Sequence, residues 1–126
     1  MPSGLLRWSM VLVDLDPTQG GAQAGARPCL VVSNDGFNRH SGLVTILPIT
    51  KRAGKQRQVY AFEVLLPAGA AGNDLESIVM PQQIRTVTRH RVRHVLGRLR
   101  DQGLRDEIED RLIDHLGIGF DGDPEP

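Results

Sequence analysis

Residues 8–35 read WSMVLVDLDPTQGGAQAGARPCLVVSND, two apolar segments joined by a loop rich in glycine and alanine. Residues 8–15 are apolar with partial alternation, which predicts a strand. Residues 28–35 begin with proline, which is tolerated at the first position of a strand, and continue with β-branched side chains. The loop buries almost nothing, yet glycine lets backbone N–H groups approach an anion. We therefore predict two neighbouring strands whose connecting loop is a candidate binding site.

Further strand-like segments follow along the chain. They are rich in β-branched residues and are separated by Gly, Pro and polar turn residues. We expect strands or short strand-like elements at residues 42–50, 59–67, 77–81, 83–87 and 94–99. Residues 89–92 fit a single helical turn with Thr88 as its N-cap.

One long amphipathic segment lies near the C-terminal end. Asp101 is a suitable N-cap, and Gly117 stands where a helix would stop. Between them, apolar residues recur every fourth position, at Leu104, Ile108, Leu112 and Leu116. Together with the short strands, this helix predicts a mainly β protein: a small, strongly curved antiparallel sheet or barrel with a C-terminal helix and short helical turns. We expect a single domain over residues 1–126, with loosely ordered ends at residues 1–7 and 118–126.

Charge is balanced overall but unevenly distributed. Lys and Arg number 15, and Asp and Glu also number 15, so the formal net charge is zero. Residues 85–100 contain no acid, whereas residues 101–126 are mostly acidic. An acid-free basic stretch is most often a solvated face, but it also suits contact with a polyanion.

The composition also bears on location. A single cysteine, Cys29, excludes an internal disulfide framework and fits a reducing cytoplasm. Its apolar neighbours favour a core residue over a nucleophile. No apolar run approaches the roughly 20 residues of a membrane span. We therefore expect a cytoplasmic protein without membrane contact.

Several familiar site types do not fit the chain. The glycine-rich loop has no lysine and leads into a strand, unlike a Walker loop. His90 and His94 have the spacing of a metal pair on a helix, but arginines lie between them and no metal is expected. Asp14 and Asp16 would point to the same side of a strand, but Asp16, which precedes Pro17, fits the start of a turn better than general acid catalysis. Nothing in the sequence supports a catalytic triad.

Arg27 is a stronger candidate. It precedes Pro28, and a residue before proline is pushed into an extended conformation that limits where its side chain points. Guanidinium is planar, always charged and able to bind phosphate through two hydrogen bonds. The residue types alone leave phosphate recognition and a solvated loop arginine both open.

The segments VLVDLDPTQGGAQAGARPCLVVSND, PIT and QIRTV occur in the order and spacing of the MazF/PemK family of toxin endoribonucleases, and the chain resembles that family from Trp8 to about Gly117. The resemblance implies a CcdB-like, SH3-like β-barrel with a C-terminal helix and a homodimer. It also implies sequence-specific cleavage of single-stranded RNA without metal or cofactor, and a MazE-like antitoxin partner.

The resemblance also implies the site residues. Arg27 and Thr50 match the family's catalytic arginine and threonine. Attack of the RNA 2′-hydroxyl on the adjacent phosphorus would leave a cyclic phosphate; Arg27 would stabilise the phosphorane while Thr50 positions a non-bridging oxygen. The residues implied in RNA binding are Thr18, Gly20, Gly21, Gln23, Gln82, Gln83 and Arg85.

The chain departs from the family at several positions. Ser9, Ala22 and Gln82 are neutral where the family often has an acid, which predicts either a more positive groove or weaker catalysis. Trp8 replaces a usual glycine and is either a base-stacking platform or a residue of the core or dimer interface. Two other functions stay open: a CcdB-like gyrase inhibitor, although the chain lacks the C-terminal Trp-Gly-Ile of that type, and a catalytically silent SH3-like interaction module.

Overall fold

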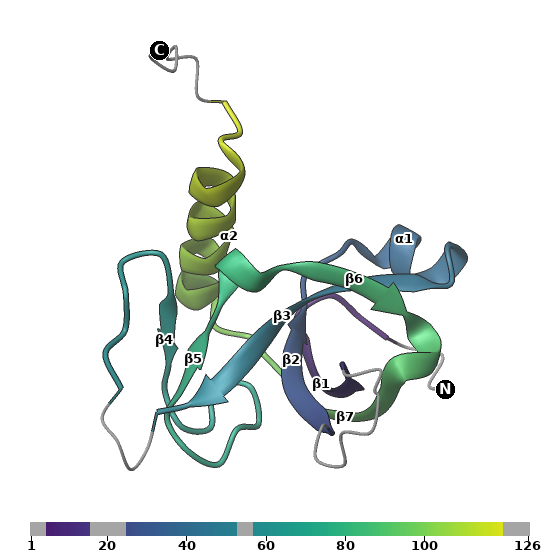
Figure 1. Ribbon diagram of the computed structural model, residues 1–126, viewed down its shortest axis with the longest axis horizontal. Helices are drawn as coiled ribbons and strands as arrows, with labels where there is room; N and C mark the ends of the chain where they lie inside the picture. Colours follow the sequence, from purple (N-terminus) through teal and green to yellow (C-terminus); the bar gives the residue numbers. More distant parts are fainter. Residues whose placement is uncertain (1–4, 16–24, 53–56, 120–126) are drawn as a thin grey trace.

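The computed structural model describes residues 5–15, 25–52 and 57–119, and its centre is a strongly curved antiparallel sheet (Figure 1). Seven strands pair in the order β4-β5-β3-β2-β1-β7, and β6 also pairs with β3. The strands are β1 (Ser9–Asp14), β2 (Ala26–Val31), β3 (Leu43–Lys51), β4 (Val64–Leu66), β5 (Ser77–Val79), β6 (Arg85–Thr88) and β7 (Val92–Arg98). The helical elements are α1 (Asp35–His40), α2 (Gln102–Leu116) and the 3-10 turns η1 (Pro81–Gln83) and η2 (Arg89–Arg91).

The first two predicted strands are antiparallel neighbours, as expected. Val11 pairs with Cys29 and Asp14 pairs with Ala26. β2 begins before the predicted start at Pro28, so the proline lies inside the strand. It is accommodated because β2 pairs with β3 only from Cys29 onward, and the missing N–H of Pro28 interrupts no ladder with β3.

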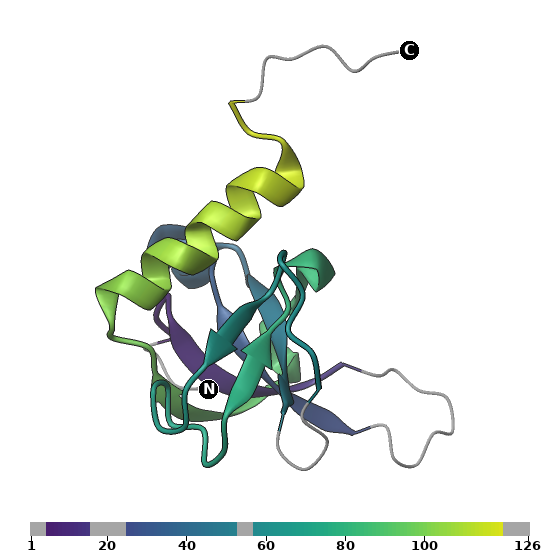
Figure 2. The ribbon, with the colours of Figure 1, turned by 90° about the vertical axis from the view of Figure 1, so that its left-hand side faces the viewer.

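Both faces of the sheet are buried at its centre, because alternate residues of β1, β2 and β3 enter two different apolar clusters. One cluster lies under α2 and includes Leu30, Leu47, Ile49 and Ile108 (Figure 2). The second cluster includes Val11, Val13, Cys29, Val31, Val44, Ile46 and Val87. The face on which a strand residue lies therefore follows from its position in the alternation along the strand.

The C-terminal helix confirms the predicted caps. The Asp101 carboxylate accepts from Leu104 N at 3.0 Å, and Gly117 ends the helix in the left-handed region with φ 68°. Ile108 is fully buried, but Leu116 is 53% exposed, so the expected apolar stripe is wrong at its last position. Figure 1 shows the reason: the C-terminal part of α2 extends beyond the strands.

The sheet is not closed into a barrel by strand pairing among the described residues. The loop between β4 and β5 instead lies against β7, where Gly72 and Gly97 allow two backbones to approach. A Cβ on Gly72, which has φ 100°, would lie 2.7 Å from the carbonyl oxygen of Leu96. This backbone contact, and not a hydrogen-bonded ladder, brings the two ends of the sheet together.

The predicted strand over residues 59–67 is wrong in its first half. Only Val64–Leu66 form β4, and Glu63 N donates to Tyr60 O at 2.9 Å in a preceding turn. The carboxylate of Glu63 is buried and accepts from Tyr60 N at 3.2 Å. This local satisfaction of a buried charge favours the turn over a regular strand.

Helix α1 was not expected from the sequence. Asn34 caps it by accepting from Phe37 N at 2.8 Å, within residues predicted to continue the second strand. The predicted turn at residues 89–92 is confirmed as η2; Thr88 is at its N-cap position but its side chain makes no capping bond. No described helix is long and apolar enough to cross a membrane.

Of residues 1–7, where a loosely ordered end was expected, the structure describes residues 5–7, and these are anchored. Leu5 is 5% exposed. Arg7 N donates to the Asp35 carboxylate at 2.7 Å, and its guanidinium pairs with Glu109 at 3.1 Å. Residues 5–7 are therefore tied to both helices.

Candidate functional site

Arg27 and Thr50 lie on adjacent strands and on the same side of the sheet. Cys29 of β2 pairs with Pro48 of β3 in antiparallel register. Continuing this register by two residues on each strand places Arg27 across from Thr50, since side chains repeat on one face every second residue. Arg27 is exposed and Thr50 is half-buried. The pairing of β2 with β3 itself ends at Cys29 and Pro48, so Arg27 and Thr50 are each two residues beyond the last positions of this pairing.

Cys29 shows which charges converge on this region. Its thiol is fully buried, and burial raises its pKa to about 12, while the charges of Arg27 and Arg85 act in the opposite direction. Both arginines therefore lie near the thiol. The prediction that Cys29 is a core residue is confirmed by its burial, and its raised pKa keeps the thiol protonated at neutral pH.

The surroundings of Arg27 suit an anionic ligand. It is the second residue of β2, immediately before Pro28. No carboxylate among the described residues forms an ion pair with its guanidinium. The predicted loop residues Thr18, Gly20, Gly21 and Gln23, and the neutral Ala22, lie outside the described residues.

Residues 82–86 (QQIRT) include three predicted RNA-binding residues, and these lie in two different environments. Gln83 at the end of η1 and Arg85 at the start of β6 are exposed. Arg85 pairs with Ile46 of β3 and so lies on the same face as Cys29. Gln82 differs, because its amide nitrogen donates to Glu63 Oε2 at 2.7 Å and its oxygen is buried without a partner among the described residues. Gln82 is thus half-buried and bonded to Glu63, whereas Arg27, Gln83 and Arg85 are exposed.

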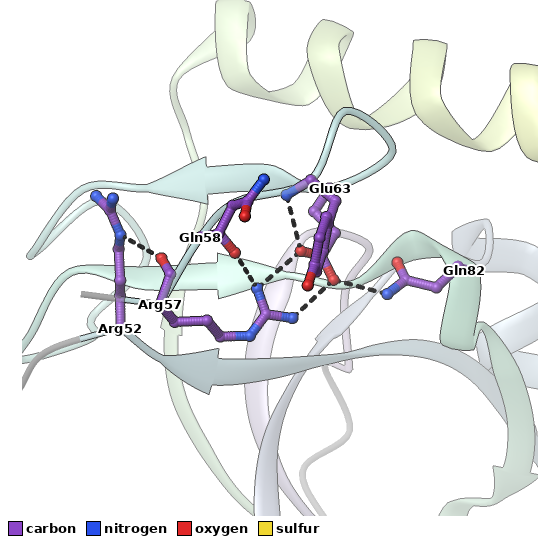
Figure 3. A network of polar contacts seen from close by, with 6 residues as sticks. Arg52, Arg57, Gln58, Glu63 and Gln82 are labelled. Carbon is purple, nitrogen blue, oxygen red and sulfur yellow. Dashed lines mark hydrogen bonds and ion pairs between the residues drawn. The ribbon is translucent and has the colours of Figure 1, made fainter. Parts of the chain in front are cut away.

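Glu63 is the centre of a polar network that the sequence did not reveal (Figure 3). Its side chain is fully buried and accepts from both terminal nitrogens of Arg57, at 2.9 and 3.0 Å. Burial raises the pKa of this carboxyl, but the bonds from Arg57, Gln82 and Tyr60 N outweigh it and leave the pKa below its usual value. The same pairing raises the pKa of Arg57. The signal in the sequence that could have revealed this network is Glu63 itself, the only acid in the apolar segment at residues 59–67.

Arg52 connects this network to the end of β3. Its Nε donates to the carbonyl of Arg57 at 2.8 Å, and its guanidinium pairs with Glu76 at 3.1 Å. The segment that carries Arg57 is therefore fixed close to the strand that carries Thr50. The Glu63 network consequently links β3, the turn before β4 and η1.

Trp8 and Ser9, two departures from the family pattern, are both 4% exposed. Trp8 has φ 75°, in the left-handed region that favours glycine. The guanidinium groups of Arg7 and Arg105 lie 4.7 and 5.5 Å from its ring. The core interpretation of Trp8 is confirmed and the base-stacking one is wrong, because a buried ring offers no face to a base. Ser9 is likewise unable to alter the charge of an exposed groove.

The basic stretch is partly neutralised. Asp14 pairs with Arg93 at 3.3 Å, and its carbonyl accepts from Arg91 at 3.0 Å. His90 lies in η2 and His94 in β7, so they do not share a helical face. Within the described ranges, no three His, Cys, Asp or Glu side chains are grouped closely enough to hold a metal ion.

A cavity of about 310 Å³ lies on the opposite face of the sheet from Arg27 and Thr50. Its walls include Met10, Leu12, Pro28, Ile49 and Leu96. Alternation explains the separation, because Pro28 and Ile49 are the sequence neighbours of Arg27 and Thr50. The cavity is therefore distinct from the predicted catalytic pair.

Comparisons with known proteins agree with this architecture. Residues 6–116 match the family of the PemK-like, MazF-like toxin of type II toxin-antitoxin system. The chain is 33% identical over 111 residues to Endoribonuclease MazF9 of Mycobacterium tuberculosis, covering 84% of this chain and 91% of that protein.

Solved structures show the same fold. MazF of Deinococcus radiodurans is 29% identical, with TM-score 0.70 over 90% of this chain and 96% of that one. The MazE-MazF structure (Form-II) from the same organism matches at 27% identity and TM-score 0.68, over 90% and 96% of the two chains. A mycobacterial endoribonuclease in complex with its cognate antitoxin has TM-score 0.74 at 24% identity, over 94% and 100% of the two chains.

Proposed function

The chain belongs to the PemK-like, MazF-like toxins of type II toxin-antitoxin systems, and we propose that it cleaves single-stranded RNA at specific sequences without a metal ion or cofactor. The observation that supports the proposal is the antiparallel pairing of Cys29 with Pro48, because the same register continued by two residues on each strand would set Arg27 opposite Thr50. Arg85 adds a second positive charge on that face. An exposed guanidinium beside a hydroxyl suits a phosphodiester.

The proposed reaction is a transesterification. The RNA 2′-oxygen forms a bond to the adjacent phosphorus while the bond from phosphorus to the 5′-oxygen breaks. The proton lost by the 2′-hydroxyl is balanced by one gained by the departing 5′-oxygen, giving a cyclic phosphate and a free 5′-hydroxyl. Arg27 stabilises the negative charge that builds on the phosphorane, and Thr50 orients a non-bridging oxygen by donating a hydrogen bond.

RNA recognition in this proposal uses the exposed residues next to that pair. Gln83 and Arg85 contact the strand beyond the reacting phosphate. The family resemblance also assigns RNA binding to Thr18, Gly20, Gly21 and Gln23, which lie outside the described residues. Gln82 acts indirectly, because its bond to Glu63 fixes the turn that carries Gln83.

The proposal includes two protein partners. The MazE-MazF structures of Deinococcus radiodurans support a MazE-like antitoxin that neutralises the toxin. Family membership also supports a homodimer. Size-exclusion chromatography with light scattering tests the dimer, and co-purification with the product of an adjacent small reading frame tests the antitoxin.

Cleavage of a defined single-stranded RNA in EDTA tests the enzymatic proposal. We expect products with a cyclic phosphate and a 5′-hydroxyl, no cleavage when the reacting nucleotide is 2′-deoxy, and almost none with Arg27→Ala. Cleavage that needs a divalent ion, or that survives the 2′-deoxy substitution, contradicts the mechanism. Inhibition of gyrase without RNA cleavage would identify a CcdB-like toxin instead, and neither activity would leave an interaction module.

A further inference from the structure

Two of the few aromatic side chains are displayed at the surface. The chain has one Trp, one Tyr and three Phe. Tyr60 is 46% exposed and Phe62 is 48% exposed, and their rings stack with centroids 5.5 Å apart and an angle of 13° between the planes. An exposed, nearly parallel pair of rings adds apolar surface that the core does not use. Such surfaces in soluble proteins frequently bind a ligand.

The turn that carries the two rings is held in place from inside. Tyr60 N donates to the buried Glu63 carboxylate, Glu63 N donates back to Tyr60 O, and the Arg57 guanidinium lies 5.5 Å from the Tyr60 ring. The aromatic pair is therefore preorganised, and a ligand that stacks on it need not order the turn.

A cavity of about 310 Å³ adjoins Phe62, between the turn and α2. It is lined by Ala61, Phe62, Arg111, Asp114 and His115. The aromatic wall is apolar and flat, whereas the wall from α2 presents hydrogen-bonding groups. Arg111 Nε is buried and has no hydrogen-bond partner among the described residues. A ligand that fits both walls has apolar flat faces and a polar edge.

We propose that Phe62, supported by Tyr60, is a stacking site for one unpaired base of the RNA, whose polar edge meets Arg111, Asp114 and His115. This inference rests on the proposed function. A nucleobase combines a π face with an edge of donors and acceptors, and stacking on aromatic rings tolerates any base. A peptide would not need two parallel rings beside mixed donors and acceptors. The site would therefore bind a base beyond the cleaved phosphodiester.

The test uses RNA with a single 2′-deoxy nucleotide at the mapped cleavage position and 2-aminopurine placed at each other position in turn. We expect one position at which the wild-type protein quenches the fluorescence. Phe62→Leu keeps apolar bulk but removes the ring, so it should abolish that quenching and weaken binding about fivefold to a hundredfold. Phe37→Leu, in α1, is the matched control and should bind as the wild type does. A free mononucleotide should bind far more weakly than the RNA.

Three outcomes overturn the stacking site. They are quenching at no position, quenching that Phe62→Leu leaves unchanged, and loss of antitoxin binding without loss of RNA binding, which would identify a protein contact. A short RNA that lacks the stacked base should be cleaved equally by wild type and Phe62→Leu. If the wild type cleaves RNA through Arg27 while Phe62→Leu binds normally, only the stacking site fails. If the wild type neither binds nor cleaves RNA, the proposed function fails with it.

Discussion

Arg27 and Arg57 have the same side chain and opposite surroundings. Arg57 places two nitrogens on the carboxylate of Glu63, which is fully buried. Arg27 is exposed beside Pro28, and no carboxylate in the described part of the chain pairs with it. The charge of Arg57 is therefore neutralised within the protein. The charge of Arg27 is exposed, on the face of the sheet that also carries Thr50. Residue type alone therefore does not separate a structural arginine from a candidate catalytic one.

The same contrast extends to their neighbours. Gln82 donates to Glu63, whereas Gln83, the next residue in the chain, is exposed. One turn of 3-10 helix thus joins the internal network to the proposed RNA surface. Substitutions in the two regions should affect different properties: catalysis at Arg27, and stability at Glu63.

Arg27→Ala should show the largest effect. Removal of one donor to a developing oxyanion lowers kcat by about 100- to 1,000-fold. The free energy of unfolding should change by no more than about 0.5 kcal/mol, because an exposed side chain contributes little to stability. Single-turnover cleavage and urea denaturation measure the two. A large loss of stability would show that Arg27 is structural, as Arg57 is.

Glu63→Ala should show the reverse pattern. It leaves the guanidinium of Arg57 and the amide of Gln82 without their acceptor. We expect a loss of about 3 kcal/mol of unfolding free energy, at the lower end for a broken buried ion pair because Arg57 is itself partly exposed. Urea denaturation gives the value. Glu63→Gln, which keeps the shape and one acceptor oxygen, is the control and should lose less; equal losses would mean that the charge accounts for the whole contribution and the neutral amide retains none of it.

Gln82→Glu restores the acid that the family often has, and it should destabilise this chain. It places a second carboxylate 2.7 Å from an oxygen of Glu63. Two carboxylates this close repel each other, which raises the pKa of one of them in the folded protein. A carboxyl whose pKa is raised by folding stabilises the fold at low pH, and this contribution is lost as pH increases. We expect a deficit of about 1 to 2 kcal/mol at pH 7 that shrinks as pH falls toward about 4. Gln82→Ala loses the bond without adding charge, so its deficit should change much less over that range, with only the small change that follows from losing one bond that lowers the Glu63 pKa.

The wild-type protein should show a smaller pH effect at Glu63. Its pKa lies below the usual value of 4.5, so its contribution to stability is complete above that pH and is lost as pH falls through the lower folded value. The difference in unfolding free energy between wild type and Glu63→Gln should therefore narrow on acidification below about pH 4.5. A difference that stays constant to pH 3 would contradict the assigned pKa direction.

The parts of the fold that were predictable depend on local signals. Asp101 and Gly117 bound α2 as expected, since caps act through residues within one turn. The β1 and β2 pair followed from two apolar segments around a loop. The candidate pair Arg27 and Thr50 was predicted only through the family resemblance, because the two residues are far apart in sequence and their relation depends on how β2 pairs with β3.

The parts that were missed depend on contacts between distant residues. Glu63 accepts a hydrogen bond from Gln82, which lies 19 positions later in the sequence. Where a strand was predicted over residues 59–67, the segment before Glu63 forms a turn that is held by such contacts. The same turn exposes Tyr60 and Phe62, which alternation alone would have assigned to a strand. Helix α1 is short, and its cap at Asn34 was hidden in what read as the end of a strand.

The central claim is that Arg27 and Thr50 act on one phosphate, and a double-mutant cycle in single-turnover RNA cleavage tests it most directly. Arg27→Ala, Thr50→Val and the double variant are compared, with folding checked for each. Because residues that act as a unit are non-additive, we expect the double variant to be slower than Arg27→Ala by no more than about threefold. A double variant whose loss equals the product of the two single losses would mean that the two side chains act independently, and would contradict the account.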